Sequence, residues 1–183
     1  MADGSRKPIS DEDHLIVRHV LSESVNAYGI LIAKYQVPIY NLFLRMLHNR
    51  ENAEELTQET FVRAYEALPT FRYEYRFFSW LYRIAVNQAL NSLKAQKRYV
   101  GEEYLINIPA ELDEKKSENS EHMRRAVNQL KDVSKTVIVL KYYQQLSYQE
   151  VAFALNITEK KVRSRLYEAR LQLKTILEKT GYY

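Results

Sequence analysis

The stretch LSYQEVAFALNITEKKVRSRLYEAR, residues 146–170, decides the architecture of the C-terminal third of the chain. Ser147 and Glu150 have the spacing of a capping box, which predicts that a short helix starts there. Asn156 stands where a tight turn needs a residue that tolerates left-handed backbone geometry, and Thr158 predicts the N-cap of a second helix. Two helices joined by so short a turn, the second rich in cations, indicate a helix-turn-helix.

The second of these helices divides into an apolar and a cationic face. Val162, Leu166, Ala169 and Leu173 follow helical spacing and are predicted to be buried. The polar side chains left outside, available to a nucleic acid, are Lys160, Lys161, Arg163, Ser164, Arg165, Tyr167 and Arg170. A plain helical hairpin is the alternative, but the capping signals, the turn and the small Ala152 together favour the helix-turn-helix.

The rest of the chain also favours helices. It holds only four glycines and four prolines, separated by long runs of helix formers. We therefore expect an all-α fold. Helices are expected at about 11–21, at 25–35, from Pro38 to Leu47, and from about Met123 and Ser134 onward. Two further helices have predicted N-caps. One runs from Asn52, with Glu55 as its capping-box partner, to Leu68, and the other runs from Ser79 to Arg98.

Charge divides the chain into two small domains and a linker. Residues 102–121 carry 2 Lys/Arg against 7 Asp/Glu, whereas residues 122–183 carry 12 against 5. The acidic piece also contains Pro109 and a polar run, which is typical of a linker. We expect two small helical domains at 1–100 and 122–183, joined by an acidic linker at 101–121.

Several classes of protein are disfavoured by composition. The chain has no cysteine, so disulfides and thiolate zinc sites are excluded. Its four histidines lack metal-ligand spacing, and its carboxylates on a helix are ordinary solvated groups, so we expect no catalytic residue, no metal and no cofactor. Met1–Asp13 lacks the apolar core of a signal peptide and no stretch approaches a membrane span, which predicts a cytoplasmic protein without membrane insertion.

An aromatic run is the first candidate for nucleic-acid binding. FRYEYRFFSWLY, residues 71–82, holds seven aromatic side chains in twelve residues. Stacking of an unpaired base on such a ring contributes about 1–3 kcal/mol, and arginine adds phosphate contacts. Most of these rings can instead pack a core, which is our expectation for Phe78 and Tyr82. The segment between Pro69 and Ser79 is predicted to be a loop, where Arg72, Tyr73, Tyr75 and Arg76 are harder to bury.

The helix that follows presents a polar stripe opposite its apolar rows. Arg83, Asn87, Asn91 and Lys94 recur on one outward face. Amides and cations in such a row can donate to phosphates and base edges. A merely solvated helix face would look the same, but the neighbouring aromatic loop favours DNA.

Three blocks in this order resemble a known family. ENAEELTQETFVRAYEAL (51–68), FRYEYRFFSWLYRIAVNQAL (71–90) and the helix-turn-helix block at 146–170 resemble regions two and four of extracytoplasmic-function (ECF) sigma factors of the sigma-70 family. The resemblance implies a non-catalytic sigma factor that binds core RNA polymerase and promoter DNA, recognises the minus-35 element as duplex, and melts and captures the minus-10 element. A stand-alone helix-turn-helix regulator is the rival, but it leaves the aromatic loop unexplained.

The resemblance also assigns residues to partners. It implies polymerase contacts from Glu55, Gln58, Glu59 and Val62. It implies minus-10 contacts from Phe71, Arg72, Tyr73, Tyr75, Arg76, Arg83, Asn87, Asn91 and Lys94. Minus-35 bases would be contacted by Arg163, Ser164 and Tyr167, and phosphates by Lys160, Lys161, Arg165 and Arg170. An anti-sigma factor is a further expected partner.

The resemblance also implies a role for the linker. In the family, the equivalent segment threads through polymerase near the RNA exit path. Twenty extended residues span roughly 65 Å, close to two turns of B-DNA at about 34 Å each, so both domains could reach their elements together. Tyr73, Tyr75, Arg76 and Glu168 depart from the residues common in the family. The promoter sequence therefore stays open.

Overall fold

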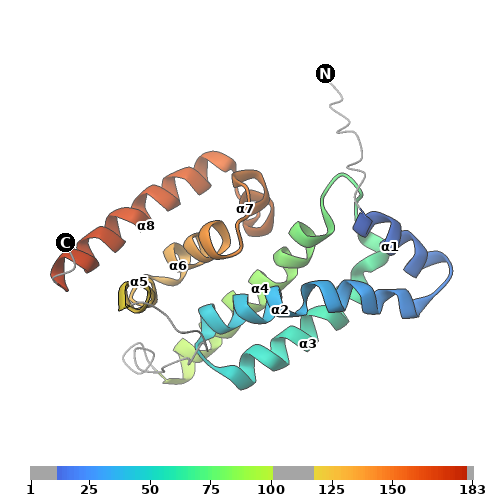
Figure 1. Ribbon diagram of the computed structural model, residues 1–183, viewed down its shortest axis with the longest axis horizontal. Helices are drawn as coiled ribbons and strands as arrows, with labels where there is room; N and C mark the ends of the chain where they lie inside the picture. The colour runs from blue at the N-terminus through green and yellow to red at the C-terminus, as the bar shows by residue number, and fades with distance from the viewer. Residues whose placement is uncertain (1–11, 101–117, 181–183) are drawn as a thin grey trace.

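The computed structural model describes residues 12–100 and 118–180, in which every regular element is a helix or a helical turn, and this confirms the all-α prediction (Figure 1). The N-terminal part comprises α1 (Glu12–Ser22), the 3-10 turn η1 (Val25–Ala27), α2 (Tyr28–Leu47), α3 (Arg50–Ala67), the 3-10 turn η2 (Leu68–Thr70) and α4 (Phe77–Val100). The C-terminal part comprises α5 (Glu118–Asn128), α6 (Asp132–Ile138), the π-helical turn η4 (Val139–Tyr143), α7 (Tyr148–Leu155) and α8 (Glu159–Lys179).

The N-terminal core lies between α2, α3 and α4, which pack pairwise. Leu31, Phe43 and Leu81 are fully buried among them, because the apolar stripes of the three helices face one another. A buried polar contact joins two of these helices, since the Thr60 hydroxyl of α3 donates to the side-chain carbonyl of Gln88 on α4. The bundle thereby sets the rotation of α4, whose opposite face stays outward.

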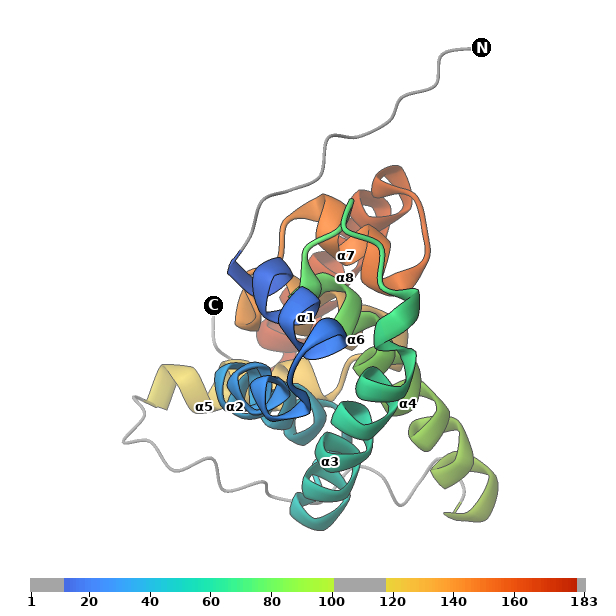
Figure 2. The same cartoon turned by 90° about the vertical axis from the view of Figure 1, so that its right-hand side faces the viewer.

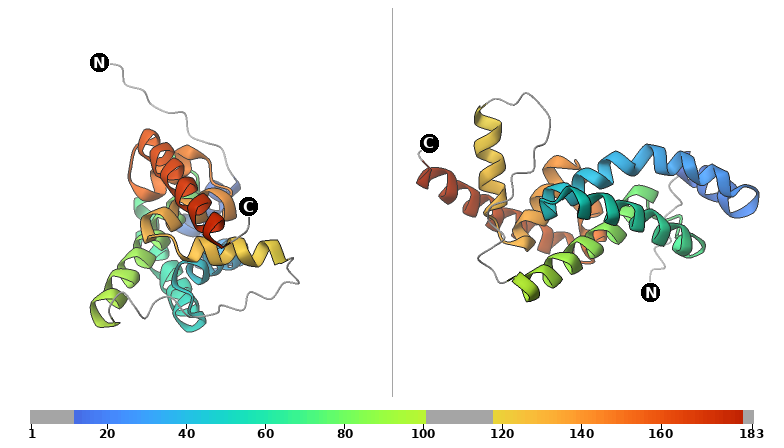
Figure 3. Two further views of the ribbon diagram at one scale, coloured as in Figure 1. Left: turned by 90° about the vertical axis from the view of Figure 1, so that its left-hand side faces the viewer. Right: turned by 90° about the horizontal axis from the view of Figure 1, so that it is seen from below.

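The C-terminal part is a second, smaller helical cluster. Val151, Val162 and Leu166 are fully buried between α6, α7 and α8. Figure 3 shows α5 crossing α8 toward its C-terminal end, where the two helices contact each other. Within the cluster, α7 and α8 pack against each other.

Helix α2 continues through Pro38, so the predicted break there is wrong. A proline inside a helix costs about 3 kcal/mol because it removes one hydrogen bond and crowds the preceding turn. Burial of Leu31 on one side of Pro38, and of Ile39 and Leu42 on the other, outweighs this cost. Tertiary packing here overrides a local signal.

Three further local predictions are wrong. Asn49, rather than Asn52, caps α3, because its side chain accepts from the Asn52 amide at 2.8 Å. Helix α4 begins at Phe77, so Ser79 lies buried inside its first turn and does not cap it. The helix predicted to begin at about Met123 begins at Glu118, and Met123 itself is exposed on α5.

The two parts lie against each other. Helices α6, α7 and α8 sit together on the side of α4 away from α3 (Figure 2), and α4 packs chiefly on α7. Of the predicted linker, residues 101–117 lie outside the described residues, whereas residues 118–121 form the first turn of α5. The helical C-terminal part therefore begins four residues before the predicted boundary at 122.

Candidate nucleic-acid interface

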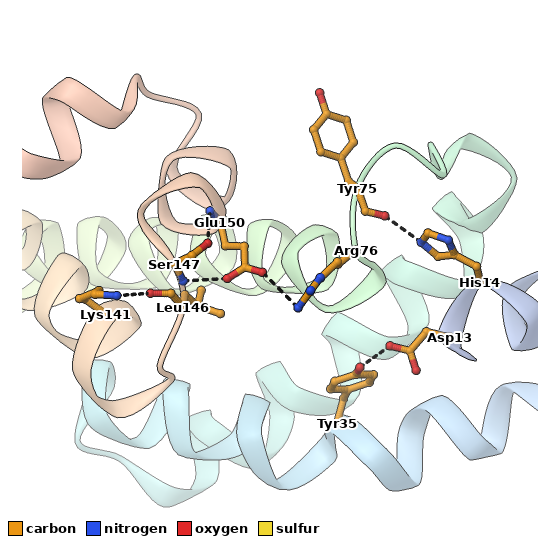
Figure 4. Close-up of polar contacts among 9 residues, drawn as sticks. All are labelled: Asp13, His14, Tyr35, Tyr75, Arg76, Lys141, Leu146, Ser147 and Glu150. Carbon is orange, nitrogen blue, oxygen red and sulfur yellow. Dashed lines mark hydrogen bonds and ion pairs between the residues drawn. The ribbon is translucent and has the colours of Figure 1, made fainter. Parts of the chain in front are cut away.

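The aromatic loop, residues 71–76, is held in place by α1. The ring nitrogen Nε2 of His14 donates to the backbone carbonyl of Tyr75 at 2.9 Å (Figure 4). The neighbouring Asp13 accepts from Lys34 at 2.6 Å and from the Tyr35 hydroxyl, which ties α1 to α2. Both His14 and Asp13 are buried. The segment is a loop, as predicted, and its contact with His14 holds the backbone in place.

Not all rings of the loop face outward. Phe71 is only 6% exposed and packs at 5.4 Å from Trp80 and 5.8 Å from Phe77, measured between ring centroids. Tyr73 is half-buried, with the Arg18 guanidinium over its ring at 5.0 Å. These two rings support the loop from within. The Tyr75 ring points away from His14 (Figure 4) and stacks outside the loop, on Phe153 of α7.

The cations of the loop are exposed and already have acidic neighbours. Arg72 lies 2.8 Å from Glu74 within the loop. Arg76 lies 3.7 Å from Glu150 of α7, and the same carboxylate accepts from the Ser147 amide at 2.7 Å (Figure 4). Ion pairs of this exposure are weak and exchangeable, so phosphates can replace the carboxylates.

The polar stripe of α4 is present as predicted. Asn87, Asn91 and Lys94 are exposed and Arg83 is half-buried. With a rise of about 1.5 Å per residue, the stripe extends for roughly 16 Å from Arg83 to Lys94. It continues directly from the loop, because α4 starts where the loop ends. Tyr75 of the loop and Arg83, the first residue of the stripe, both lie against the ring of Phe153 on α7, at 4.0 and 5.3 Å from its centroid.

Helices α7 and α8 form the predicted helix-turn-helix. Ser147 and Glu150 make both bonds of the capping box, and Thr158 accepts from the Lys161 amide at 3.2 Å. Asn156 has a φ of 53°, in the left-handed region that its short polar side chain tolerates. All three local predictions are confirmed, which fixes the angle at which α8 leaves α7.

The outward face of α8 is polar and partly self-paired. Ser164 donates to Glu168 at 3.1 Å, and the Arg163 guanidinium lies 4.5 Å from the centroid of Tyr148. The Nε of Arg170 donates to the Tyr142 hydroxyl at 2.9 Å, a contact that raises the arginine's pKa. Of the other residues predicted to contact DNA from α8, Arg165 is half-buried. The rest are exposed, namely Lys160, Lys161 and Tyr167.

The predicted polymerase-contact residues share one face of α3. Glu55 and Gln58 are exposed, and Val62 has 57% of its surface exposed. Glu59 accepts from the Arg63 Nε at 2.9 Å. An exposed valine among carboxylates is suited to a partner that offers an apolar contact ringed by cations.

Comparison with known proteins decides the family. Residues 31–99 match the model for sigma-70 region 2, and residues 120–173 match that for sigma-70 region 4. The chain is similar to the RNA polymerase sigma-H factor of Pseudomonas aeruginosa, with 31% identity over 87% of this chain and 91% of the relative. It is also similar to the ECF RNA polymerase sigma-E factor of Haemophilus influenzae, with 32% identity over 86% and 91%. The chain belongs to the ECF sigma factors.

A solved structure agrees on the fold. The sigma factor RpoE of Bartonella quintana, solved in complex with the anti-sigma factor NepR, superposes with a TM-score of 0.69 at 19% identity, over 82% of this chain and 96% of that one. Region 2 corresponds to the loop, α3 and α4 described above, and region 4 to the helix-turn-helix. This sigma factor therefore serves promoter recognition and transcription initiation and is not an enzyme.

Residues 12–100 and 118–180 contain no group of three or more histidine or acidic side chains placed to hold a metal ion. They also contain no helix long and apolar enough to cross a membrane.

Sequence reasoning missed two parts of the interface of this sigma factor. The first is α1, whose buried His14 contacts the loop while its buried Asp13 bonds to α2; the helical spacing of His14 and the buried Val17 was a usable signal. The second is Phe153 of α7, whose ring stacks on Tyr75 with centroids 4.0 Å apart. Nothing in the sequence around Phe153 points to a ring 78 residues earlier, because this contact depends on how the two regions pack.

Proposed function

We propose that this sigma factor holds the minus-10 strand on the face formed by the aromatic loop and the α4 stripe, and contacts the minus-35 duplex through α8. The observation that carries the proposal is that Tyr75 and Arg83 lie against the same ring, that of Phe153, and that the exposed Asn87 and Lys94 follow Arg83 along α4. Region 2 would comprise the chain up to 100, and region 4 the chain from 122 together with residues 118–121 of the same helix, which leaves 101–117 of the predicted linker between them.

The two DNA surfaces differ in chemistry, which supports two modes of binding. A stacking ring beside guanidinium groups suits an unpaired, flipped base, and exposed amides suit its edge. Phe71 would act from below the loop, by supporting it. A cationic helix that starts at a sharp turn suits the major groove, where Arg163, Ser164 and Tyr167 would meet bases. The flanking cations Lys160, Lys161, Arg165 and Arg170 would meet phosphates.

Protein partners complete the proposal. The α3 face with Glu55, Gln58, Glu59 and Val62 would dock on core RNA polymerase. An anti-sigma factor is proposed as a further partner, since the similar RpoE of Bartonella quintana was solved with one. Because polymerase and promoters lie in the cytoplasm of bacteria, we propose that this sigma factor acts there.

Run-off transcription with bacterial core polymerase on a library of promoter fragments tests the proposal. We expect Asn87→Ala to reduce initiation through the minus-10 element and Arg163→Ala to relax preference at the minus-35 element, each by about tenfold. Lys174→Ala, an exposed cation farther along α8, is the matched control and should change little. A protein that binds duplex DNA but never core polymerase would contradict the proposal and favour the regulator.

A further inference from the structure

The ring of Phe153 occupies the place beside Tyr75 where a base would stack. The two rings lie nearly parallel, with centroids 4.0 Å apart and planes inclined by 24°. The Arg83 guanidinium lies 5.3 Å from the centroid of the same phenylalanine. A flat ring beside a tyrosine and an arginine is the arrangement by which proteins hold unpaired bases.

Phe153 does not belong to the core of its own domain. Its neighbours Val151, Ala152 and Ala154 are buried, whereas Phe153 remains half-buried and meets Tyr75 and Arg83 of region 2. An aromatic ring on the outer side of a short helix is costly to expose to water. The ring is therefore satisfied only while α7 lies against the loop and α4.

Polar contacts around this stack align the two regions. Glu150 of α7 engages Arg76, and the Tyr82 hydroxyl of α4 donates to the side-chain carbonyl of Gln144 at 2.6 Å. Farther along α4, Lys97 lies 2.9 Å from Asp132 of α6. The contacts thus follow α4 over much of its length and cover part of the face proposed to hold the minus-10 strand.

The closed arrangement can open. An unsealed cavity lies beside the stack, lined by Glu74, Lys141 and Gln149 among others, so water reaches the Arg76 ion pair. Solvated ion pairs contribute little, and polar contacts between domains commonly exchange. A ligand that binds only the open state would shift the population toward it.

We propose that Phe153 is a built-in substitute for the captured base, which makes the closed form self-inhibited at the minus-10 site. Region 4 and the promoter strand compete for Tyr75 and Arg83, whereas the exposed α8 residues Lys160, Lys161 and Arg163 stay available to duplex DNA. This inference rests on one part of the proposed function, namely that Tyr75 and Arg83 contact the promoter strand.

Single-stranded DNA binding by the full chain without polymerase tests this competition. The probe is a fluorescent thymidine homopolymer of about 20 nucleotides, since stacking tolerates any base. We expect Phe153→Ala to bind it roughly fivefold more tightly than the wild type, because the competing ring is gone. Phe153→Tyr keeps the stack and should match the wild type. Adding Tyr75→Ala to Phe153→Ala should abolish the gain.

Two results would separate failure of the inference from failure of the proposed function. If Tyr75→Ala weakens strand binding but Phe153→Ala leaves it unchanged, the self-inhibition is wrong and the strand site stands. If Tyr75→Ala has no effect in either background, the strand site itself is wrong and the inference falls with it. Should Phe153→Ala fail to fold, Gln144→Ala opens the junction through a different contact and should raise affinity about twofold.

Distance measurements test the opening directly. The chain has no cysteine, so Leu15→Cys on α1 and Leu171→Cys on α8 provide a clean pair of exposed sites for spin labels. We expect one short inter-label distance in the wild type and a second, longer one after saturation with the homopolymer or in Phe153→Ala. A distance that stays unchanged in the saturated complex would overturn the inference.

Discussion

The Nζ of Lys135 lies 3.1 Å from the Nε2 of His48, across the junction between the end of α2 and helix α6. Lys135 is buried and His48 is half-buried. Burial lowers the pKa of Lys135 to about 8, while the charge of Asp132 acts in the opposite direction. Burial, and then the charges of Lys135 and Arg124, lower the pKa of His48 to about 4. Region 2 and region 4 thus share a junction that requires a neutral histidine.

Acid should weaken this junction. Between pH 6.5 and 4 an exposed His48 binds a proton that the folded protein excludes, so the free energy of unfolding falls as the pH drops through that window. The loss should approach about 3 kcal/mol at most. Urea unfolding at pH 7.5, 5.5 and 4.5 measures it.

The control for acid sensitivity is His48→Asn. His48 has a φ of 56°, which asparagine tolerates, and an amide can still accept from Lys135. This variant should lose less stability between pH 7.5 and 4.5 than the wild type does. An equal loss in both proteins would assign the acid sensitivity to other groups.

Loss of the α1 support should disable the loop. His14→Ala removes the donor to the Tyr75 carbonyl and the ring that packs on Phe71 and Tyr73, at centroid distances of 5.5 and 5.4 Å. We expect a loss of about 2 kcal/mol in stability and an approximately tenfold loss of initiation. Thermal unfolding and run-off transcription measure the two effects, and Leu15→Ala, at an exposed neighbour, should affect neither.

A β-branched side chain in the turn of the helix-turn-helix should lower the stability of the protein. Asn156 is in the left-handed region, where a β-branched residue is strained. Asn156→Val should cost about 1–2 kcal/mol and weaken duplex binding, whereas Asn156→Gly should stay close to the wild type. Unfolding and duplex-binding titrations distinguish these outcomes; equal behaviour of the two variants would show that the turn is not constrained.

Substitutions at Thr60 of α3 and Gln88 of α4 should have non-additive effects on the free energy of unfolding. Thr60→Val leaves the Gln88 amide, whose Nε2 has no hydrogen-bond partner, with its carbonyl also unpaired in the core. We expect a loss of about 1–3 kcal/mol, and a smaller loss when Gln88→Leu is added to Thr60→Val. A double-mutant cycle of unfolding free energies measures this, and additive losses would argue against the bond.

Local signals predicted those parts of the fold that short-range chemistry decides. The caps at Ser147 and Thr158 and the left-handed Asn156 depend on side chains bonding to backbone within a few residues, so spacing alone revealed them. The same reasoning failed at Pro38 and Ser79, where buried apolar contacts outweigh a local preference. The outward stripe on α4 was predicted because helical periodicity reports which face is polar.

The sequence by itself determined the all-helical class, the helix-turn-helix and the residues that we propose for two DNA surfaces. Only the tertiary structure decided that α1 supports the loop through His14 and that Phe153 covers Tyr75. These contacts join residues 61 and 78 positions apart, and periodicity carries no information over such separations. Which surface is open and which is covered follows from how two domains pack, since burial is a property of the assembled chain.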